Sequence, residues 1–215
     1  MRALVIIAIA TLLAACAPQP RERAPEALPS APKEAPAGFP RDYYEKLMAA
    51  GRPVYRVDPK RSLVVIEVRR GGTLSGLGHD HVVSARNVAG YVAPEAERAD
   101  LHIALDELIV DEPALRKAAG MDTQPSESDI AGTRANMLKS LEADKHPHVF
   151  VRVFERFGRM AAAVTLHGVT RTLPASGNLD MNLKEISASG WLELNQSDFG
   201  ITPFSILGGA IAVQD

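Results

Sequence analysis

The stretch RSLVVIEVRR, residues 61 to 70, has the alternating pattern of a β-strand that buries one face. Val64, Ile66 and Val68 fall on one side of the pattern, and the charged residues Glu67 and Arg69 fall on the other. Successive side chains of an extended strand point to opposite faces of a sheet. The stretch therefore predicts a strand with one apolar face toward an interior.

Similar segments recur along the chain. ADLHIALDELIV, residues 99 to 110, places Leu101, Ile103 and Leu105 on one face. HVFVRVFER, residues 148 to 156, groups Val149, Val151 and Val153 in the same way. Glycine, serine and asparagine turns separate the strand-like segments that follow, which are RMAAAVTLHG (159–168), GVTRTLPASGNLDMNL (168–183), KEISASGWLELNQ (184–196) and PFSILGGAIAV (203–213).

Two regions have helical features instead. RDYYEKLMAAG, residues 41 to 51, predicts a short helix that ends at Gly51. A second helical region is expected around residues 112–144, where Pro113 suits a first helical position. Within it, Ser126 and Asp129 have the spacing of a capping box, in which each side chain satisfies the other residue's backbone N–H.

Many short strands with one helical insertion predict an all-β fold. Regular crossover helices are absent from the pattern, so a parallel sheet is not expected, and a closed or nearly closed antiparallel barrel is. A barrel of about eight strands has an interior that either side chains or one slender ligand can fill. Aromatic residues make up only 5% of the chain, which leaves room for a ligand. A fully packed interior is the alternative.

The N-terminus predicts export and lipidation. Residues 1–15 form a short apolar segment after Arg2, as in a signal peptide, and end in Leu-Ala-Ala before Cys16. This sequence looks like a bacterial lipobox, and Cys16 is the only cysteine in the chain, so it cannot close an internal disulfide. Two or three acyl chains on Cys16 would anchor the protein stably. Ala17 at the next position indicates the outer membrane by analogy with bacterial sorting patterns.

The remaining composition sets the domain organisation. Residues 16–40 hold the lipidated cysteine and a Pro/Ala-rich tether, and residues 41–215 suit one domain with a sizeable core. The formal net charge is −2, and no basic stripe is present, so nucleic acid is not expected as a partner. The expected location is the bacterial cell envelope, lipid-anchored and facing the periplasm.

Four stretches in order resemble a known family. They are YRVDPKRSLVVIEVRR (55–70), the expected helix 129–141 with HPHVFVRV (146–153), LHGVTR (166–171) and QSDFGI (196–201). From about Pro53 to the C-terminus the chain resembles the YceI-like, polyisoprenoid-binding family. The resemblance implies a lipocalin-like, extended antiparallel β-barrel that holds a long isoprenoid or similar apolar chain in its lumen. It implies no chemistry on that ligand and no cofactor.

Rows of aliphatic residues would provide the wall of such a lumen. Removing apolar surface from water contributes about 25 cal/mol per Å². Trp191 could also meet a ligand head group through its ring N–H. The lumen candidates are Val64, Ile66, Val68, Leu101, Ile103, Leu105, Val149, Val151, Val153, Trp191 and Phe199.

Two features depart from the family pattern. The sequence ends with GGAIAVQD, about where one more barrel strand is expected, so the last barrel strand is expected to be missing and two neighbouring strands to have unpaired edges. In addition, GHDH, residues 78–81, stands where the family has a more apolar stretch that contains aromatic residues. The ligand preference of the family therefore need not apply to this chain.

The histidines suggest a different function. His79 and His81 are two residues apart, as are His146 and His148, so each pair would share one face of a strand if its stretch is extended. The glycines before His79 indicate a turn instead, in which case these are exposed loop histidines bonded to backbone or water. Two such pairs together could hold Zn²⁺ or another divalent metal, and the protein would then bind a metal or be a metal-dependent enzyme. No HExxH, CxxC or GxSxG motif supports an enzyme. A packed barrel that binds an unspecified protein partner is the third possibility.

Overall fold

A computed structural model describes residues 35–182 and 185–215. The signal peptide, Cys16 and most of the tether lie outside these residues. None of the helices in the described ranges is long and apolar enough to cross a membrane. The helices are α1 (Arg41–Ala49), α2 (Pro113–Ala118) and α3 (Glu127–Ser140), with 3-10 turns η1 (Ser75–Leu77), η2 (Pro94–Ala96), η3 (Leu105–Glu107), η4 (Ser197–Phe199) and η5 (Leu207–Gly209).

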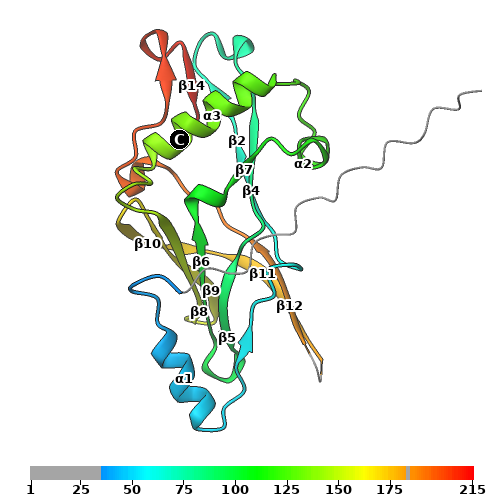
Figure 1. Ribbon diagram of the computed structural model, residues 1–215, viewed down its shortest axis with the longest axis vertical. Helices are drawn as coiled ribbons and strands as arrows, with labels where there is room; N and C mark the ends of the chain where they lie inside the picture. Colours follow the sequence, from blue (N-terminus) through cyan, green and yellow to red (C-terminus); the bar gives the residue numbers. More distant parts are fainter. Residues whose placement is uncertain (1–34, 183–184) are drawn as a thin grey trace, which may run out of the picture.

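The strands pair antiparallel throughout, which confirms the all-β, antiparallel class (Figure 1). They are β1 (Tyr55–Arg56), β2 (Val64–Val68), β3 (Arg70–Gly71), β4 (His81–Ala85), β5 (Ala89–Ala93), β6 (Arg98–Ala104), β7 (Ile109–Val110), β8 (His148–Arg156), β9 (Arg159–Leu166), β10 (Val169–Pro174), β11 (Ser176–Met181), β12 (Ile186–Trp191), β13 (Ser205–Ile206) and β14 (Ile211–Val213). The largest sheet has the order β1-β5-β6-β8-β9-β10.

A closed ring of hydrogen-bonded strands is not formed among the described residues. Besides the largest sheet there are three smaller ones, in the orders β2-β4-β7, β13-β14-β3 and β11-β12. The chain passes from one sheet to another at short interruptions: Arg69 separates β2 from β3, residues 86–88 separate β4 from β5, and η3 precedes β7. At each interruption the chain leaves the strands of one sheet and joins those of another. Strand β14, the last one in the sequence, pairs with both β13 and β3. The expectation that one further barrel strand is missing stays a prediction.

The predicted helices are present, with one refinement. Helix α1 ends at Ala49, and Gly51 has a φ of +73°, a left-handed conformation that glycine adopts readily. The helical insertion consists of two helices, α2 and α3. Its capping box is confirmed, because the Asp129 N–H donates to Ser126 Oγ at 3.2 Å and the Ser126 N–H donates to Asp129 Oδ2 at 2.9 Å.

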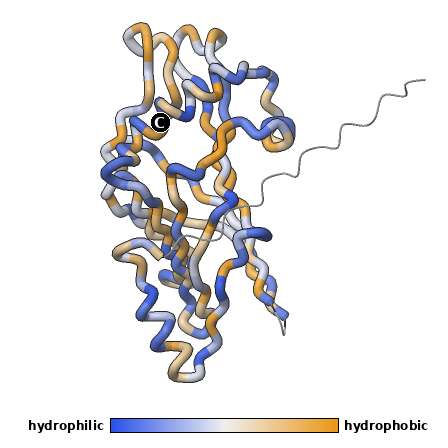
Figure 2. Tube along the Cα trace, viewed as in Figure 1, coloured by the Kyte–Doolittle hydropathy of each residue, from blue (hydrophilic) through white to orange (hydrophobic). Residues whose placement is uncertain are grey.

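Two clusters hold most of the buried hydrophobic residues. Hydrophobic residues are spread along the strands over the length of the molecule rather than gathered at one end (Figure 2). Helix α3 covers the first cluster with Ile130, Met137 and Leu138, and Leu141 directly after the helix also packs against it. The α3-side cluster comprises Val83, Ala85, Val88, Ile103, Leu105, Leu108 and Val110. The β9-side cluster comprises Ala162, Val164, Leu166, Phe199 and Ile201.

Helix α1 is held on the opposite face of the large sheet by a buried polar contact. The Tyr44 hydroxyl donates to Asp100 Oδ2 at 2.7 Å, and Asp100 also accepts from Arg98 and Arg152. Burial of the Asp100 carboxyl opposes its ionisation, but these hydrogen bonds prevail and lower its pKa. Burial, together with the bond to Asp100, raises the pKa of Tyr44. The contact fixes the segment that follows the tether against β6 and β8.

Candidate functional site

The interior face of the large sheet is lined by aliphatic residues. Leu101 lies opposite Val151, and Ile103 lies opposite Val149, in the β6–β8 register. On the other side of β8, Val151 faces Val164 and Val153 faces Ala162. Leu101 and Val149 contact the α3-side cluster, while Val149, Val151 and Val153 contact the β9-side cluster. The structure therefore brings five of the lumen candidates onto one face, which we call the interior face.

Strand β2 continues this face. Val64 and Val68 contact the α3-side cluster, and Ile66, which has the same parity, lies opposite Val83 of that cluster. Ile66 is nonetheless 43% exposed. Val65 lies on the opposite face and is 42% exposed.

Two further lumen candidates are fully packed. Leu105 lies in η3 rather than in a strand, although it belongs to the α3-side cluster, and it is 1% exposed. Phe199 lies in η4 and is completely buried in the β9-side cluster. These two side chains are packed in the core and offer no accessible wall.

The β11–β12 hairpin presents its apolar face toward β9. Gly177 lies directly opposite Gly190, and a Cβ built on Gly177 would lie 3.5 Å from the sulfur of Met160. Leu179 and Met181 have the same parity as Gly177 and are 48% and 61% exposed. Sequence analysis missed both residues, although the alternation Leu179-Asp180-Met181 is a strand signal.

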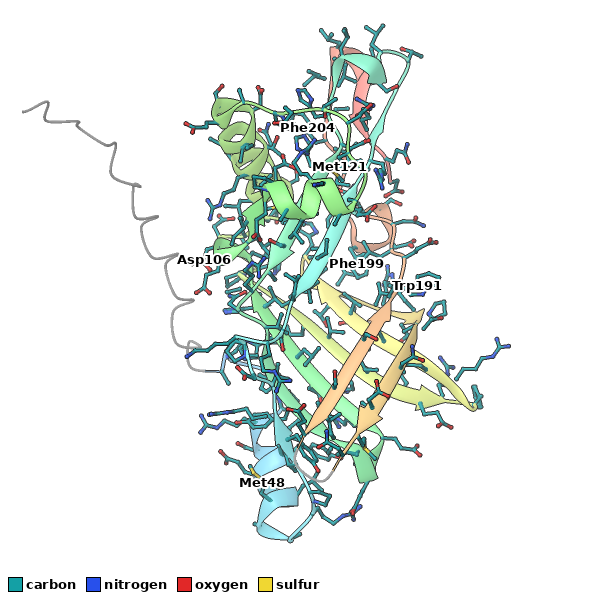
Figure 3. All side chains as sticks on the ribbon, turned by 90° about the vertical axis from the view of Figure 1, so that its right-hand side faces the viewer. Met48, Asp106, Met121, Trp191, Phe199 and Phe204 are labelled. Atoms are coloured by element: carbon teal, nitrogen blue, oxygen red, sulfur yellow. The ribbon has the colours of Figure 1, made fainter. Side chains whose placement is uncertain are left out.

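Trp191 does not join the interior, contrary to its expected role. It pairs with Ser176, on the hairpin face opposite to that of Gly177, and is 66% exposed. Its neighbour Leu192 contacts the β9-side cluster instead. Figure 3 shows Trp191 projecting away from the molecule at the end of the hairpin, whereas Phe199 lies within it. The indole N–H therefore does not lie on the interior side.

His79 and His81 are close together but differ in their surroundings. Their ring centroids are 6.2 Å apart. His81 Nδ1 lies 2.6 Å from Asp111 Oδ2, and its Nε2 lies 3.5 Å from Thr133 Oγ1 on α3. His79 lies in the irregular segment between η1 and β4, and its buried Nδ1 has no hydrogen-bond partner among the described residues. The strand alternation that would align the two rings begins only at His81.

Asp111 connects His81 to a buried arginine. Its carboxylate also accepts from the Val82 N–H at 3.0 Å and from Arg116 Nη1 at 2.6 Å. Burial opposes ionisation of Asp111, but the hydrogen bonds from His81, Val82 and Arg116 prevail, and its pKa lies below the usual value. The arrangement is an ion pair that joins β4 to α2.

The four histidines do not form the expected metal site. His146 packs against His167, with ring centroids 5.4 Å apart, and His148 packs against His102 at 6.3 Å. Within residues 35–182 and 185–215, no group of three or more His, Cys, Asp or Glu side chains could hold a metal ion. The reason is topological: His148 begins β8 on the sheet face that carries His102, while the His79 ring contacts the His81 ring and His81 reaches Thr133 of α3.

A family model described as "YceI-like domain" matches residues 55–215, which is most of the chain. No curated protein matches the sequence.

Proposed function

The chain belongs to the YceI-like family, and from this membership we propose that it binds an isoprenoid-like or other long apolar chain on its interior face. Proteins of this family are generally binding proteins rather than enzymes, and they bind isoprenoids or lipids. In this proposed function the protein holds its ligand without changing it chemically and needs no cofactor.

One observation carries the proposal: the interior face is aliphatic and remains partly accessible. Ile66 lies opposite Val83 of the α3-side cluster, and Leu179 and Met181 share the hairpin face on which Gly177 approaches Met160 of β9. Each of the three keeps more than two fifths of its surface exposed. A packed interaction module would instead bury such residues against one another. A ligand that covers a further ~100 Å² of apolar surface would gain roughly 2.5 kcal/mol.

We expect Ile66→Glu to weaken binding of a fluorescent farnesyl probe by at least about tenfold, as measured by fluorescence titration. A carboxylate on the interior face must lose hydration when the apolar chain arrives, and a loss of about 1.4 kcal/mol corresponds to a factor of ten. The side chain is already 43% exposed, so the substitution need not bury a charge in the free protein.

Val65→Glu is the matched control for this substitution. Val65 is adjacent in the same strand, is 42% exposed, and points to the other face. The Val65→Glu protein should bind the probe as the unchanged protein does. Equal weakening by the two substitutions would show that the probe does not distinguish the faces and would contradict the proposed site.

We also propose that Cys16 carries the lipid that anchors the protein to the bacterial envelope, facing the periplasm at the outer membrane. The lipobox-like sequence before the only cysteine supports this proposal. Cells grown with an alkyne analogue of palmitate should incorporate label into the protein, and Cys16→Ser should abolish the labelling. An unlabelled parent protein, or a labelled Cys16→Ser protein, would be incompatible with this anchor.

A further inference from the structure

Two adjacent loops form one end of the molecule. The first is residues 71–78, which include η1, and the second is residues 203–214, which include β13, η5 and β14. The Leu74 N–H donates to the carbonyl oxygen of Ala210 at 2.7 Å, and β14 pairs with β3, so the two loops lie side by side. Figure 1 shows β14 at one end of the molecule and α1 at the other. We call the two loops together the apolar tip.

The apolar tip exposes large aliphatic side chains and carries no charged residue. Neither loop contains Asp, Glu, Lys, Arg or His. Leu77 and Leu207 are 72% and 70% exposed, and Leu74 and Ile206 are 45% and 46% exposed. A single exposed hydrophobic residue needs no explanation, but a group of them marks a surface that contacts a protein or a membrane. Here four such residues lie on two adjoining loops.

The backbone holds the two loops close together. Gly72 has a φ of +87°, and a Cβ at this position would lie 2.4 Å from the carbonyl oxygen of Ala210. Arg70 Nη1 donates to the carbonyl oxygen of Gly78 at 3.0 Å and so closes the base of the first loop. Leu207 has a φ of +52°, a left-handed conformation that is unusual for a bulky residue. The exposed leucines therefore belong to a closely packed backbone.

The composition of the apolar tip favours a lipid bilayer over a protein partner. The residues that dominate binding between proteins are enriched in Trp, Tyr and Arg, and Leu is under-represented among them. Neither loop contains Trp, Tyr or Arg. Entry into a bilayer instead requires uncharged side chains, because a charge would have to lose its hydration. Both loops meet this condition over their whole length.

The charges at the base of the apolar tip do not favour electrostatic binding. Arg69 and Arg70 directly precede the first loop. Both lie close to the carboxylate of Asp80, at 3.6 Å and 3.9 Å, and Arg70 also lies 3.6 Å from Asp122. These acids balance the positive charge that would otherwise attract an anionic surface. Attraction between the tip and lipid is therefore apolar.

The position of the anchor makes a bilayer available to the tip. The described chain begins at residue 35, and the anchor proposed above is at Cys16. The chain between them spans at most about 65 Å when fully extended. An acylated Cys16 would keep the domain within that distance of the membrane, so docking of the tip would be intramolecular and would proceed at a high effective concentration.

We propose that the apolar tip docks into the lipid bilayer, with Leu77 and Leu207 at the level of the acyl chains and α1 directed away from the membrane. The inference adds an interaction surface to the proposed binding of an apolar chain. It relies on the proposed anchor only for proximity to the membrane.

The test places one environment-sensitive NBD fluorophore on the tip. Cys16 is the only cysteine, so its acylation leaves no free thiol and Leu77→Cys supplies a unique site for labelling. The labelled protein is reconstituted in phosphatidylcholine vesicles with or without nitroxide spin labels on the acyl chains. The spin labels should remove at least about half of the NBD emission, because the tip enters the acyl region. This loss should be the same at low and high salt, since no charge takes part.

Leu207→Asp tests the second loop in the same labelled protein. Aspartate tolerates the left-handed φ at this position, so the substitution is compatible with the fold. Its carboxylate resists transfer from water into the bilayer. We expect NBD at position 77 to recover most of its emission in spin-labelled vesicles.

Met48→Cys is the matched control. Met48 is an apolar residue that is 45% exposed, and Figure 3 shows it at the opposite end of the molecule from Phe204 of the apolar tip. NBD at position 48 should keep its emission in spin-labelled vesicles. Equal quenching at positions 48 and 77, or no quenching at position 77, would contradict the docking.

Two further results separate this proposal from its alternatives. A blue-shifted NBD spectrum at position 77 in detergent-free buffer, before vesicles are added, would show that a second copy or another segment of the chain covers the tip, and would overturn the proposal. Labelling of the unchanged protein would reject the acyl anchor at Cys16 alone. The same comparison of positions 48 and 77 in Cys16→Ser protein mixed with vesicles would then decide the docking.

Discussion

Gly90→Ala is expected to lower the free energy of unfolding by roughly 2–5 kcal/mol. Gly90 lies in β5 opposite Leu101 and has a φ of +152°, a conformation that residues with a Cβ rarely adopt. A Cβ at this position would lie 2.1 Å from the carbonyl oxygen of Asp100. That oxygen belongs to the backbone of β6 and cannot rotate away, so β5 and β6 would have to separate.

Urea unfolding followed by circular dichroism measures this effect, and Gly132→Ala is its control. Gly132 lies inside α3, and among the described residues no atom beyond its own helix backbone and chain neighbours lies within 4 Å of a Cβ built there. The same substitution should therefore stabilise the protein, by about 0.5–1 kcal/mol, because alanine favours a helix interior over glycine. If the two substitutions had effects of the same sign, the close approach of β5 and β6 would be in doubt.

Asp111→Ala should cost about 3–5 kcal/mol of stability. The Asp111 side chain is fully buried and is bonded to His81, Val82 and Arg116. The Arg116 side chain is 8% exposed and donates to the carbonyl oxygens of Asp80 and Thr123 as well. Without the carboxylate, its guanidinium would be a buried charge with no counter-charge, which is more costly than the loss of a surface ion pair.

Two companion substitutions separate the causes. Asp111 has a φ of +59°, which asparagine tolerates at least as well as aspartate, so Asp111→Asn removes the charge but keeps the backbone preference and one acceptor. It should lose less stability than Asp111→Ala. Asp122→Ala removes a carboxylate that is 74% exposed, 3.6 Å from Arg70, and should change stability by less than about 0.5 kcal/mol. An Asp111→Ala protein as stable as the Asp122→Ala protein would contradict the buried ion pair.

Local alternation predicted the interior face well. The grouping of Leu101 and Ile103 with Val149, Val151 and Val153 follows from the two-residue period of single strands, and the β6–β8 register brings the two groups together. The capping box of α3 was likewise visible in four consecutive residues, because both partners lie within one helical turn. Features that depend on neighbouring residues alone were therefore predictable.

Features that depend on contacts between distant parts of the chain could not be predicted from the sequence. Trp191 and Leu192 are adjacent and both apolar, so alternation cannot decide which one faces inward, and the contact of Leu192 with the β9-side cluster decides it. The ion pair of Asp111 with Arg116 and His81 joins three separate elements and has no sequence signature. The pattern around His79 and His81 likewise left open whether the stretch is extended, and only the structure shows that β4 begins at His81 and leaves His79 outside it.

Native mass spectrometry of the protein purified from its own envelope in mild detergent tests the central claim most directly. We expect a fraction of the molecules to carry one additional mass that matches a single long-chain amphiphile and disappears after solvent extraction. The additional mass should persist in Val65→Glu and be depleted in Ile66→Glu. Repeated preparations of the parent protein at the polypeptide mass alone, apart from covalent lipidation, would contradict the claim that the interior face holds an apolar chain.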